Sequence, residues 1–202
     1  MLVLASASPR RREMLARLGL PHRTEAVAID ERPRPGETPA ACAERLCLAK
    51  ADAASRRHPE AWVLAADTIV ALGAAIFGKP AGRVEARDML AALAGRTHEV
   101  LTAYCLRAPA GAASGAPALV RTVRTEVDVA PLDAAALDAY LDSGEWQDKA
   151  GAYAIQGLFA YAVAAIRGSY TNVVGLPLCE IVADLRRLGV VGEAPRGSGD
   201  SP

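Results

Sequence analysis

One string near the N-terminus combines hydroxyl and guanidinium groups at the start of an expected helix. In LASASPRRR, Ser8 precedes a helix whose first turn holds Arg10, Arg11 and Arg12. The free N–H groups of a helix start bind anions, and so do hydroxyls and guanidinium forks. Because cations oppose the macrodipole at this end of a helix unless an anion is present, the string predicts a phosphate site. A solvated basic turn is the alternative.

A single carboxylate interrupts an apolar segment, where Asp67 lies in the string AADTIV. Burying a carboxylate is unfavourable unless it is paired, hydrogen-bonded or bound to a metal. Asp67 is therefore a candidate functional acid, and the alternative is a structural ion pair with an arginine. Lys79 follows in FGKP, where Gly78 and Pro80 form a rigid turn from which an ammonium group could reach a phosphate oxygen or Asp67.

Two later strings contain scarce polar residues. In DKAGAYAIQG, Gln156 offers both a hydrogen-bond donor and an acceptor, which suits the recognition of a base edge. A polar loop that closes a strand is the alternative. In GSYTNVVGLPL, we interpret Asn172 as part of a structural turn, and we interpret His98 in RTHEV as a structural histidine rather than a catalyst.

The lysines stand out because the 23 basic residues include only three of them, Lys50, Lys79 and Lys149. A chain that otherwise uses arginine keeps lysine where a compact ammonium group is required and a planar guanidinium does not fit. Lys79 and Lys149 fall inside the strings described above. The composition therefore indicates that these ammonium groups contribute to a site.

The elements that position these strings follow from hydrophobic periodicity and from glycine and proline signals. Helices are predicted over residues 9–18, 40–55, 84–93, 133–143 and 177–188. Strands are predicted over residues 2–6, 62–72, 76–77, 99–107, 119–129, 161–166 and 171–174. Their irregular alternation predicts an α/β fold with a mixed twisted sheet flanked by helices, in two lobes with a central cleft.

Length and composition favour one globular domain. With 202 residues, 51% hydrophobic and 23% charged, the chain is expected to form a single domain over residues 1–191. The stretch APAGAASGAP reads as a hairpin tip, and residues 192–202 as a disordered tail. The four cysteines form no CxxC pair and are expected to be reduced, semi-buried thiols.

Charge and the order of the first residues bear on partners and location. The net charge of zero argues against nucleic acid and anionic membranes as partners. Because the N-terminal arginines follow the apolar residues, their order is wrong for a secretory signal, and we expect a cytoplasmic protein. The apolar stretch over residues 61–77 is short and contains Asp67, which argues against a membrane span.

Taken together, the strings resemble the Maf family of nucleoside triphosphate pyrophosphatases, also called septum formation inhibitor Maf proteins. The resemblance spans residues 2–188 and rests on LASASPRR, AADTIV with GKP, GRTHEVLT, DKAGAYAIQG and GSYTNVVGLPL, in the order of the family. SPRR with DKAGAYAIQG resembles the branch that acts on dTTP and UTP rather than the branch that acts on methylated GTP. The implied fold is of the Maf/ITPase-like type.

The resemblance also implies roles for individual residues. It implies a catalytic proton acceptor, three residues for nucleobase specificity, contacts to the triphosphate, and a divalent metal, Mg²⁺ or Mn²⁺. These residues are Asp67 as proton acceptor; Arg10, Thr68 and Gln156 for the base; Ser8, Arg11, Lys50 and Lys79 for the triphosphate; and Glu31 with Asp67 near the metal.

The implied reaction is hydrolysis of dTTP or UTP between the α and β phosphates, giving the monophosphate and pyrophosphate and removing unwanted nucleotides. A nucleoside triphosphate is thus the expected partner, and a homodimer is left open. One alternative is a non-catalytic nucleotide-binding regulator of cell division, against which the carboxylate of Asp67 argues. Another is a phosphotransferase or nucleotidyl transferase, although the sequence lacks the GxxxxGK[ST] loop of P-loop kinases.

Overall fold

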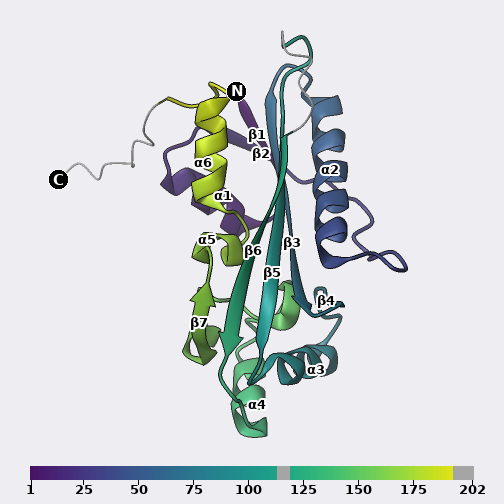
Figure 1. Ribbon diagram of the computed structural model, residues 1–202, viewed down its shortest axis with the longest axis vertical. Helices are drawn as coiled ribbons and strands as arrows, with labels where there is room; N and C mark the ends of the chain where they lie inside the picture. The colour runs from purple at the N-terminus through teal and green to yellow at the C-terminus, as the bar shows by residue number, and fades with distance from the viewer. Residues whose placement is uncertain (113–118, 193–202) are drawn as a thin grey trace, which may run out of the picture.

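A mixed sheet runs through the centre of the computed structural model, which describes residues 1–112 and 119–192. Its strands follow the order β2-β1-β3-β5-β6-β7, with β4 paired to β3 (Figure 1). The strands are β1 (Leu2–Ala5), β2 (His22–Glu25), β3 (Trp62–Leu72), β4 (Ala75–Phe77), β5 (Thr97–Arg107), β6 (Leu119–Val129) and β7 (Val163–Arg167). β1 is parallel to β2 and β3, and the other pairs are antiparallel.

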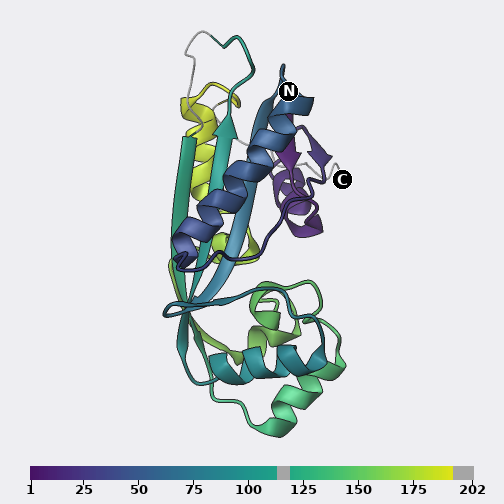
Figure 2. The ribbon, with the colours of Figure 1, turned by 90° about the vertical axis from the view of Figure 1, so that its right-hand side faces the viewer.

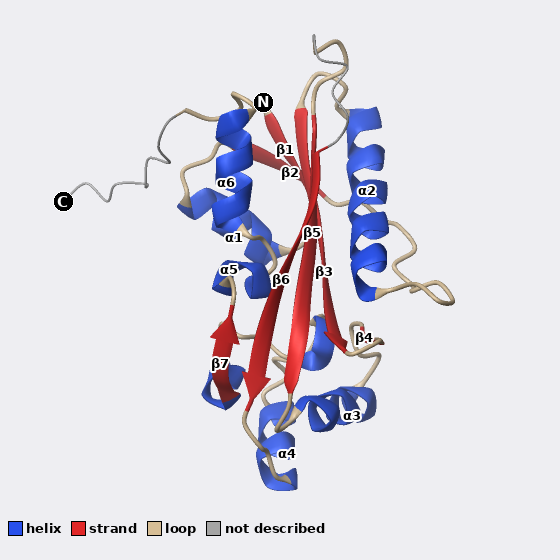
Figure 3. Cartoon of the chain, viewed as in Figure 1, coloured by secondary structure: helices blue, strands red, loops and turns tan. Residues whose placement is uncertain are grey.

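Helices cover both faces of this sheet. They are α1 (Pro9–Arg17), α2 (Pro39–Arg57), α3 (Arg83–Leu93), α4 (Ala134–Asp142), α5 (Tyr170–Val174) and α6 (Leu178–Arg187), with 3₁₀ turns η1 (Ala150–Ala152) and η2 (Leu158–Ala162). α2 packs on one face, while α1, α5 and α6 lie on the other (Figure 3). Along the long strands, α1, α2 and α6 gather at one end and α3 and α4 at the other (Figure 2). The expectation of a mixed, two-lobed α/β fold is confirmed.

Alternation along β3 explains the two cores. Val63, Ala65 and Ile69 belong to the core under α2, whereas Leu64 and Val70 belong to the core on the opposite side, which also contains residues of α1 and α6. Successive side chains of a strand point to opposite faces, so a strand covered on both faces is apolar nearly throughout. β3 is therefore buried over most of its length, and a charged residue within it requires a partner.

Capping residues set the starts of two helices. The Thr38 hydroxyl accepts a hydrogen bond from the Ala41 amide before α2, and the Asp133 carboxylate accepts one from Ala136 before α4. These bonds satisfy N–H groups that have no partner inside the helix. At the start of α1, Pro9 follows Ser8 as expected, although the Ser8 hydroxyl makes no capping bond within the described residues.

Most predicted elements are confirmed, and one is wrong. β3 and β6 have the predicted bounds, but residues 171–174 form helix α5 rather than a strand. The Ser169 hydroxyl accepts a hydrogen bond from the Asn172 amide at its start, and Gly175 ends it with a φ of 129°. These two caps override the strand preference of the paired valines. The helix brings Asn172 and Gly175 against the sheet.

The sequence analysis missed β2, η1 and η2. β2 is an edge strand of sequence HRTE, half-exposed, and has no apolar alternation to identify it. η2 takes the first two residues of the strand predicted over 161–166. The predicted tail beyond residue 192 and the centre of the predicted hairpin tip, residues 113–118, lie outside the described residues. No helix within the described ranges is both long and apolar enough to cross a membrane.

Candidate functional site

The site lies where β3 changes partners along one edge. β1 pairs with β3 as far as Ala65, and β4 pairs with it from Val70 onward. Asp67 and Thr68 lie between these two pairings, where β5 continues on the other edge. As neighbours in a strand, the two residues face opposite sides of the sheet, Asp67 toward α2 and Thr68 toward α1. This gap in the pairing along one side of β3 leaves room for groups from both faces of the sheet.

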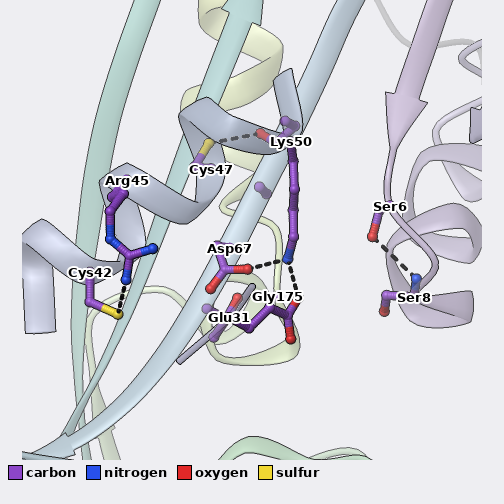
Figure 4. A network of polar contacts seen from close by, with 12 residues as sticks. Ser6, Ser8, Glu31, Cys42, Arg45, Cys47, Lys50, Asp67 and Gly175 are labelled. Carbon is purple, nitrogen blue, oxygen red and sulfur yellow. Dashed lines mark hydrogen bonds and ion pairs between the residues drawn. The ribbon is translucent and has the colours of Figure 1, made fainter. Parts of the chain in front are cut away.

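On the α2 face, carboxylates and ammonium groups alternate. The Lys50 ammonium group reaches from α2 to contact the carboxylates of Asp67 and Glu31 (Figure 4). The distance from Lys50 Nζ to Glu31 Oε1 is 2.7 Å, and Glu31 Oε2 lies 3.6 Å from Lys79 Nζ. Lys50 and Asp67 are each 7% exposed, while Glu31 and Lys79 face solvent. We call these four residues the charged row.

The charged row shows the contacts of Asp67 and Lys79, for which the sequence left alternatives open. Asp67 is paired as a buried carboxylate requires, and its partner is Lys50 rather than the arginine of the structural alternative. Lys79 contacts Glu31, which joins it to the same row. Burial is the largest influence on the pKa of Glu31 and raises it, but the contacts with Lys50 and Lys79 outweigh burial and lower that pKa overall. Glu31 is therefore ionised at neutral pH.

On the other face, Arg11 is nearly buried and donates to four oxygens. Its Nε donates to Gly175 O at 2.8 Å, and its Nη2 donates to the Thr68 hydroxyl at 2.8 Å. Its Nη1 donates to Ala66 O at 2.7 Å and to the Ser6 hydroxyl at 3.4 Å. Burial lowers the pKa of Arg11, and the nearby Asp67 charge opposes that shift.

These bonds give Arg11 a structural task at the site. A guanidinium has five N–H donors, so one N–H on Nη2 is left for a ligand. The bond to Ala66 O satisfies a carbonyl of β3 just beyond its pairing with β1. Arg11 thus ties the start of α1 to β3 and to the end of α5, next to Asp67.

A chain of polar contacts continues from Thr68 into the core. The Thr68 and Thr102 hydroxyl oxygens lie 2.9 Å apart, and the Thr102 hydroxyl donates to Asn172 O at 3.0 Å. The Asn172 side-chain amide donates to Val100 O and to the Thr125 hydroxyl, both at 3.0 Å. Thr102, Thr125 and Asn172 are all fully buried. Our structural interpretation of Asn172 fits this position.

The start of α1 also meets the string DKAGAYAIQG. Burial lowers the pKa of Arg10, and its Nε is buried with no hydrogen-bond partner in the described part of the chain. Burial and the Arg10 charge both lower the pKa of Lys149. The Arg10 charge thus acts on Lys149, and two cations within range of each other favour an anionic ligand.

Close backbone contacts hold the same string against β3 and β4. The Gly151 amide donates to Gly78 O at 3.1 Å, beside Lys79. Gly151 has a φ of 69°, and a Cβ at this position would lie 2.9 Å from Val70 Cγ1. Asp148 and Ala152 adopt positive φ values of 58° and 59°, an uncommon conformation that concentrates at functional sites. Glycine at position 151 therefore permits this approach.

Two predicted site residues stand apart from these contacts. Gln156 is exposed between η1 and η2, and Ser8 is half-buried with its amide donating to the Ser6 hydroxyl at 3.2 Å. Within residues 1–112 and 119–192, neither side chain is hydrogen-bonded to the charged row. Their roles stay predictions.

The sequence analysis did not single out Thr102, although its string GRTHEVLT contributed to the resemblance. Thr102 lies directly opposite Thr68 in the antiparallel pairing of β3 with β5. That register depends on the whole sheet. A buried hydroxyl in an apolar strand was the available signal, and it is weaker than that of a buried carboxylate.

The fold and the site together define a mixed α/β protein with a row of carboxylates and ammonium groups beside a gap in the pairing of β3. The family model described as Maf-like protein matches residues 1–188, and the chain belongs to the Maf family. This agrees with the resemblance seen in the sequence.

Several curated relatives are similar over nearly their whole length. The chain is 50% identical to a Myxococcus xanthus protein over 94% of this chain and 93% of that one. It is 51% identical to an Anaeromyxobacter dehalogenans protein (93% and 94%) and 48% identical to a Geobacter sulfurreducens protein (94% and 97%). Each of these relatives is named a dTTP/UTP pyrophosphatase.

Among solved structures, the Staphylococcus aureus Ham1 protein matches 63% of this chain and 71% of its own. The TM-score is 0.45 at 14% sequence identity. This likeness is too weak to support an argument about function.

Proposed function

We propose that this protein is a nucleoside triphosphate pyrophosphatase that hydrolyses dTTP and UTP to the monophosphate and pyrophosphate, with residues 1–191 acting as one domain. The buried contact of Asp67 with Lys50, extended by Glu31 and Lys79, carries the proposal because it concentrates two carboxylates and two ammonium groups in one place. The names and high identity of the relatives support the choice of reaction and substrate.

The acids of the charged row fit a divalent metal. Asp67 and Glu31 converge on a single cationic atom, Lys50 Nζ, so their carboxylates are close enough to share a cation. Within the described residues no group of three or more His, Cys, Asp or Glu could hold a metal. Two carboxylates suit Mg²⁺, which is commonly bound by one or two carboxylates together with substrate phosphates. A bound Mg²⁺ or Mn²⁺ would stabilise charge on the phosphates.

The cations of the site would hold the triphosphate. Lys50 and Lys79 would neutralise charge on the departing pyrophosphate, and the free N–H of Arg11 would add one hydrogen bond. Ser8 would offer its hydroxyl at the start of α1. These groups raise turnover because the negative charge on the leaving group grows in the transition state.

Asp67 would act as the proton acceptor. Water attacks the α phosphorus in line, its oxygen forms the new P–O bond, and its proton passes to the carboxylate of Asp67. The bond from the α phosphorus to the bridging oxygen breaks, and pyrophosphate leaves with the electron pair. Arg10, Thr68 and Gln156 would read the base. The cellular role would be removal of unwanted nucleotides.

Product analysis with isotopically labelled water tests this proposal. The purified protein is incubated with Mg²⁺ and each of dTTP, UTP, CTP, ATP, GTP and a methylated GTP in ¹⁸O water. We expect pyrophosphate and monophosphate in equal amounts from dTTP and UTP, with ¹⁸O in the monophosphate and loss of activity when the metal is chelated. Release of orthophosphate, or ¹⁸O in the pyrophosphate, would contradict the proposed bond cleavage. Tight nucleotide binding without turnover would favour a non-catalytic regulator.

A further inference from the structure

The Thr68 hydroxyl sits between a fixed donor and a second hydroxyl. It accepts a hydrogen bond from Arg11 Nη2 at 2.8 Å, and its oxygen lies 2.9 Å from that of Thr102. The Thr102 oxygen lies 3.0 Å from Asn172 O. The three contacts run from the start of α1 through β3 and β5 to α5.

Only one arrangement of the two hydroxyl protons satisfies these contacts. Asn172 O is a carbonyl oxygen and can only accept, so the proton between it and Thr102 must belong to Thr102. If Thr102 instead donated to Thr68, two acceptor oxygens would face each other 3.0 Å apart in a fully buried place, which is unfavourable. Thr102 therefore donates to Asn172, and Thr68 donates to Thr102.

The end of the chain of contacts is held rigidly. The Asn172 side-chain amide Nδ2 donates to Val100 O and to the Thr125 hydroxyl, and the Thr125 hydroxyl donates to Ser169 O. Since Val100 O can only accept, the orientation of the Asn172 side chain is also determined. The backbone carbonyl that receives the Thr102 proton thus has little freedom to move.

The hydrogen bonds that Thr68 already makes determine what it can offer to a ligand. A hydroxyl has one donor and two acceptor lone pairs. Thr68 uses its donor on Thr102 and one lone pair on Arg11, so a single acceptor lone pair is left. Thr68 is half-buried at the interrupted edge of β3, where a ligand could reach it.

We infer that the relay from Thr68 through Thr102 to Asn172 fixes Thr68 as a hydrogen-bond acceptor, so that the site selects a base carrying a ring N–H. Uracil and thymine have such an N–H between two carbonyl groups, whereas cytosine has an unprotonated ring nitrogen there. An acceptor facing that nitrogen is unfavourable. Thr102 and Asn172 are positioning residues in this account, which rests on the proposed function and its placement of Thr68 at the base.

The test compares the specificity constants, kcat/KM, for UTP and CTP. Thr102→Val keeps the shape of the side chain but removes the hydroxyl, which frees the Thr68 proton to turn toward the site and donate to cytosine. We expect the UTP to CTP ratio to fall by about fivefold or more, mainly through better use of CTP. Thr102→Ser restores the hydroxyl and should keep the ratio within about twofold of the parent.

Thr122→Val is the matched control. Thr122 lies on the neighbouring strand β6, and its hydroxyl donates to Glu44 at 2.7 Å on the α2 face, away from Thr68. We expect this variant to keep the parental ratio. A purely structural role of Thr102 would lower kcat/KM for both nucleotides alike, so an unchanged ratio in Thr102→Val would overturn the relay while leaving the proposed function intact.

A measurement on the parent protein tests the inference even if Thr102→Val fails to fold. N3-methyluridine triphosphate keeps both carbonyls of uracil but lacks the ring N–H. We expect its kcat/KM to be about tenfold or more below that of UTP. Equal use of the two nucleotides would overturn the inference. If the parent hydrolyses no pyrimidine triphosphate at all, the proposed function fails, and the inference that rests on it fails too.

Discussion

Asp67 and Lys50 are buried in the same place, and each provides the other with an opposite charge. Such a pair is weak support for stability, because desolvation offsets much of its attraction. In the proposed function the pair has a chemical role, in which the carboxylate accepts a proton while the ammonium group neutralises phosphate. Glu31 gives Lys50 a second partner, so the ammonium group keeps one carboxylate if the other is removed.

The first prediction concerns Asp67→Asn. The amide has the shape of the carboxylate but cannot accept the proton of water, so we expect kcat for UTP to fall by about 10² to 10⁴. Nucleotide binding should change much less, because Lys50 retains Glu31. Steady-state kinetics with binding by calorimetry measure both effects. Asp88→Asn, on the exposed surface of α3, is the control, and a kcat within threefold of the parent for Asp67→Asn would remove Asp67 from the mechanism.

The second prediction separates the geometry of Arg11 from its charge. Arg11→Lys keeps the charge but loses the fork that reaches four oxygens in three segments of the chain. We expect the free energy of unfolding to fall by about 1 to 3 kcal/mol, because buried acceptors lose their donor. Urea denaturation measures this change.

The adjacent Arg12 supplies the control for that experiment. It is exposed in the same turn of α1, so Arg12→Lys should alter the free energy of unfolding by less than about 0.5 kcal/mol. Equal effects of the two substitutions would mean that the bonds of Arg11 contribute nothing measurable to the fold.

At the scale of elements, the sequence predicted most helices and strands but not how they meet. Periodicity and glycine signals were enough for β3 and β6, whose bounds agree with the prediction. They failed for α5, where a serine cap and a glycine stop flank a helix of only five residues. The partner of Asp67 was out of reach for a different reason. Lys50 and Asp67 meet only because α2 packs across β3, and local patterns do not encode that contact.

The same distinction applies to the string DKAGAYAIQG. Glycines permit a close backbone approach, but the sequence does not show which surface the string approaches. The structure places Gly151 against Val70 of β3 and beside Gly78. Two strings separated in the sequence are thereby joined, and Lys79 and Lys149 come to the same end of the sheet. Contacts between distant elements of this kind require the topology of the sheet as well as the sequence pattern.

The third prediction tests this contact. Gly151→Ala adds a Cβ that would lie 2.9 Å from Val70 Cγ1, at a φ of 69°. Gly36→Ala is the matched control, because Gly36 has a φ of 73° and its added Cβ meets nothing within 4 Å. The left-handed backbone should lower the free energy of unfolding of each variant by about 1 to 2 kcal/mol, and Gly151→Ala should lower it clearly more than Gly36→Ala does.

A second substitution shows whether the additional loss arises from the clash. Val70→Ala removes the methyl groups that the new Cβ would meet, although it leaves a cavity of its own. In a double-mutant cycle, Gly151→Ala combined with Val70→Ala should be less destabilised than the sum of the two single variants. Additive losses would show that Val70 is not the obstacle.

At the scale of the whole molecule, one buried histidine links stability to pH. His98 begins the apolar part of β5, is 1% exposed, and its Nε2 lies 2.8 Å from the Tyr153 hydroxyl, within DKAGAYAIQG. Its Nδ1 is buried with no hydrogen-bond partner among the residues that the structure describes. This surrounding suits a neutral imidazole, in agreement with our structural interpretation of His98. Protonation would place a charge in the core that joins the strand to that string.

The fourth prediction follows from the pKa of His98. Burial lowers this pKa from 6.5 to about 4, with the Asp128 charge opposing the shift. Because the folded protein binds the proton less readily than the unfolded chain, the stabilisation is complete above pH 6.5 and is lost as the pH falls toward 4. From pH 7.5 to pH 5, this residue should lower the free energy of unfolding by about 2 kcal/mol.

Urea denaturation at both pH values measures the loss in the parent. His98→Gln cannot take up that proton, so its loss over the same range should be smaller by a similar amount, whereas His22→Gln, at the edge strand β2, should behave as the parent does. Equal pH dependence in the parent and in His98→Gln would show that some other group causes the acid sensitivity.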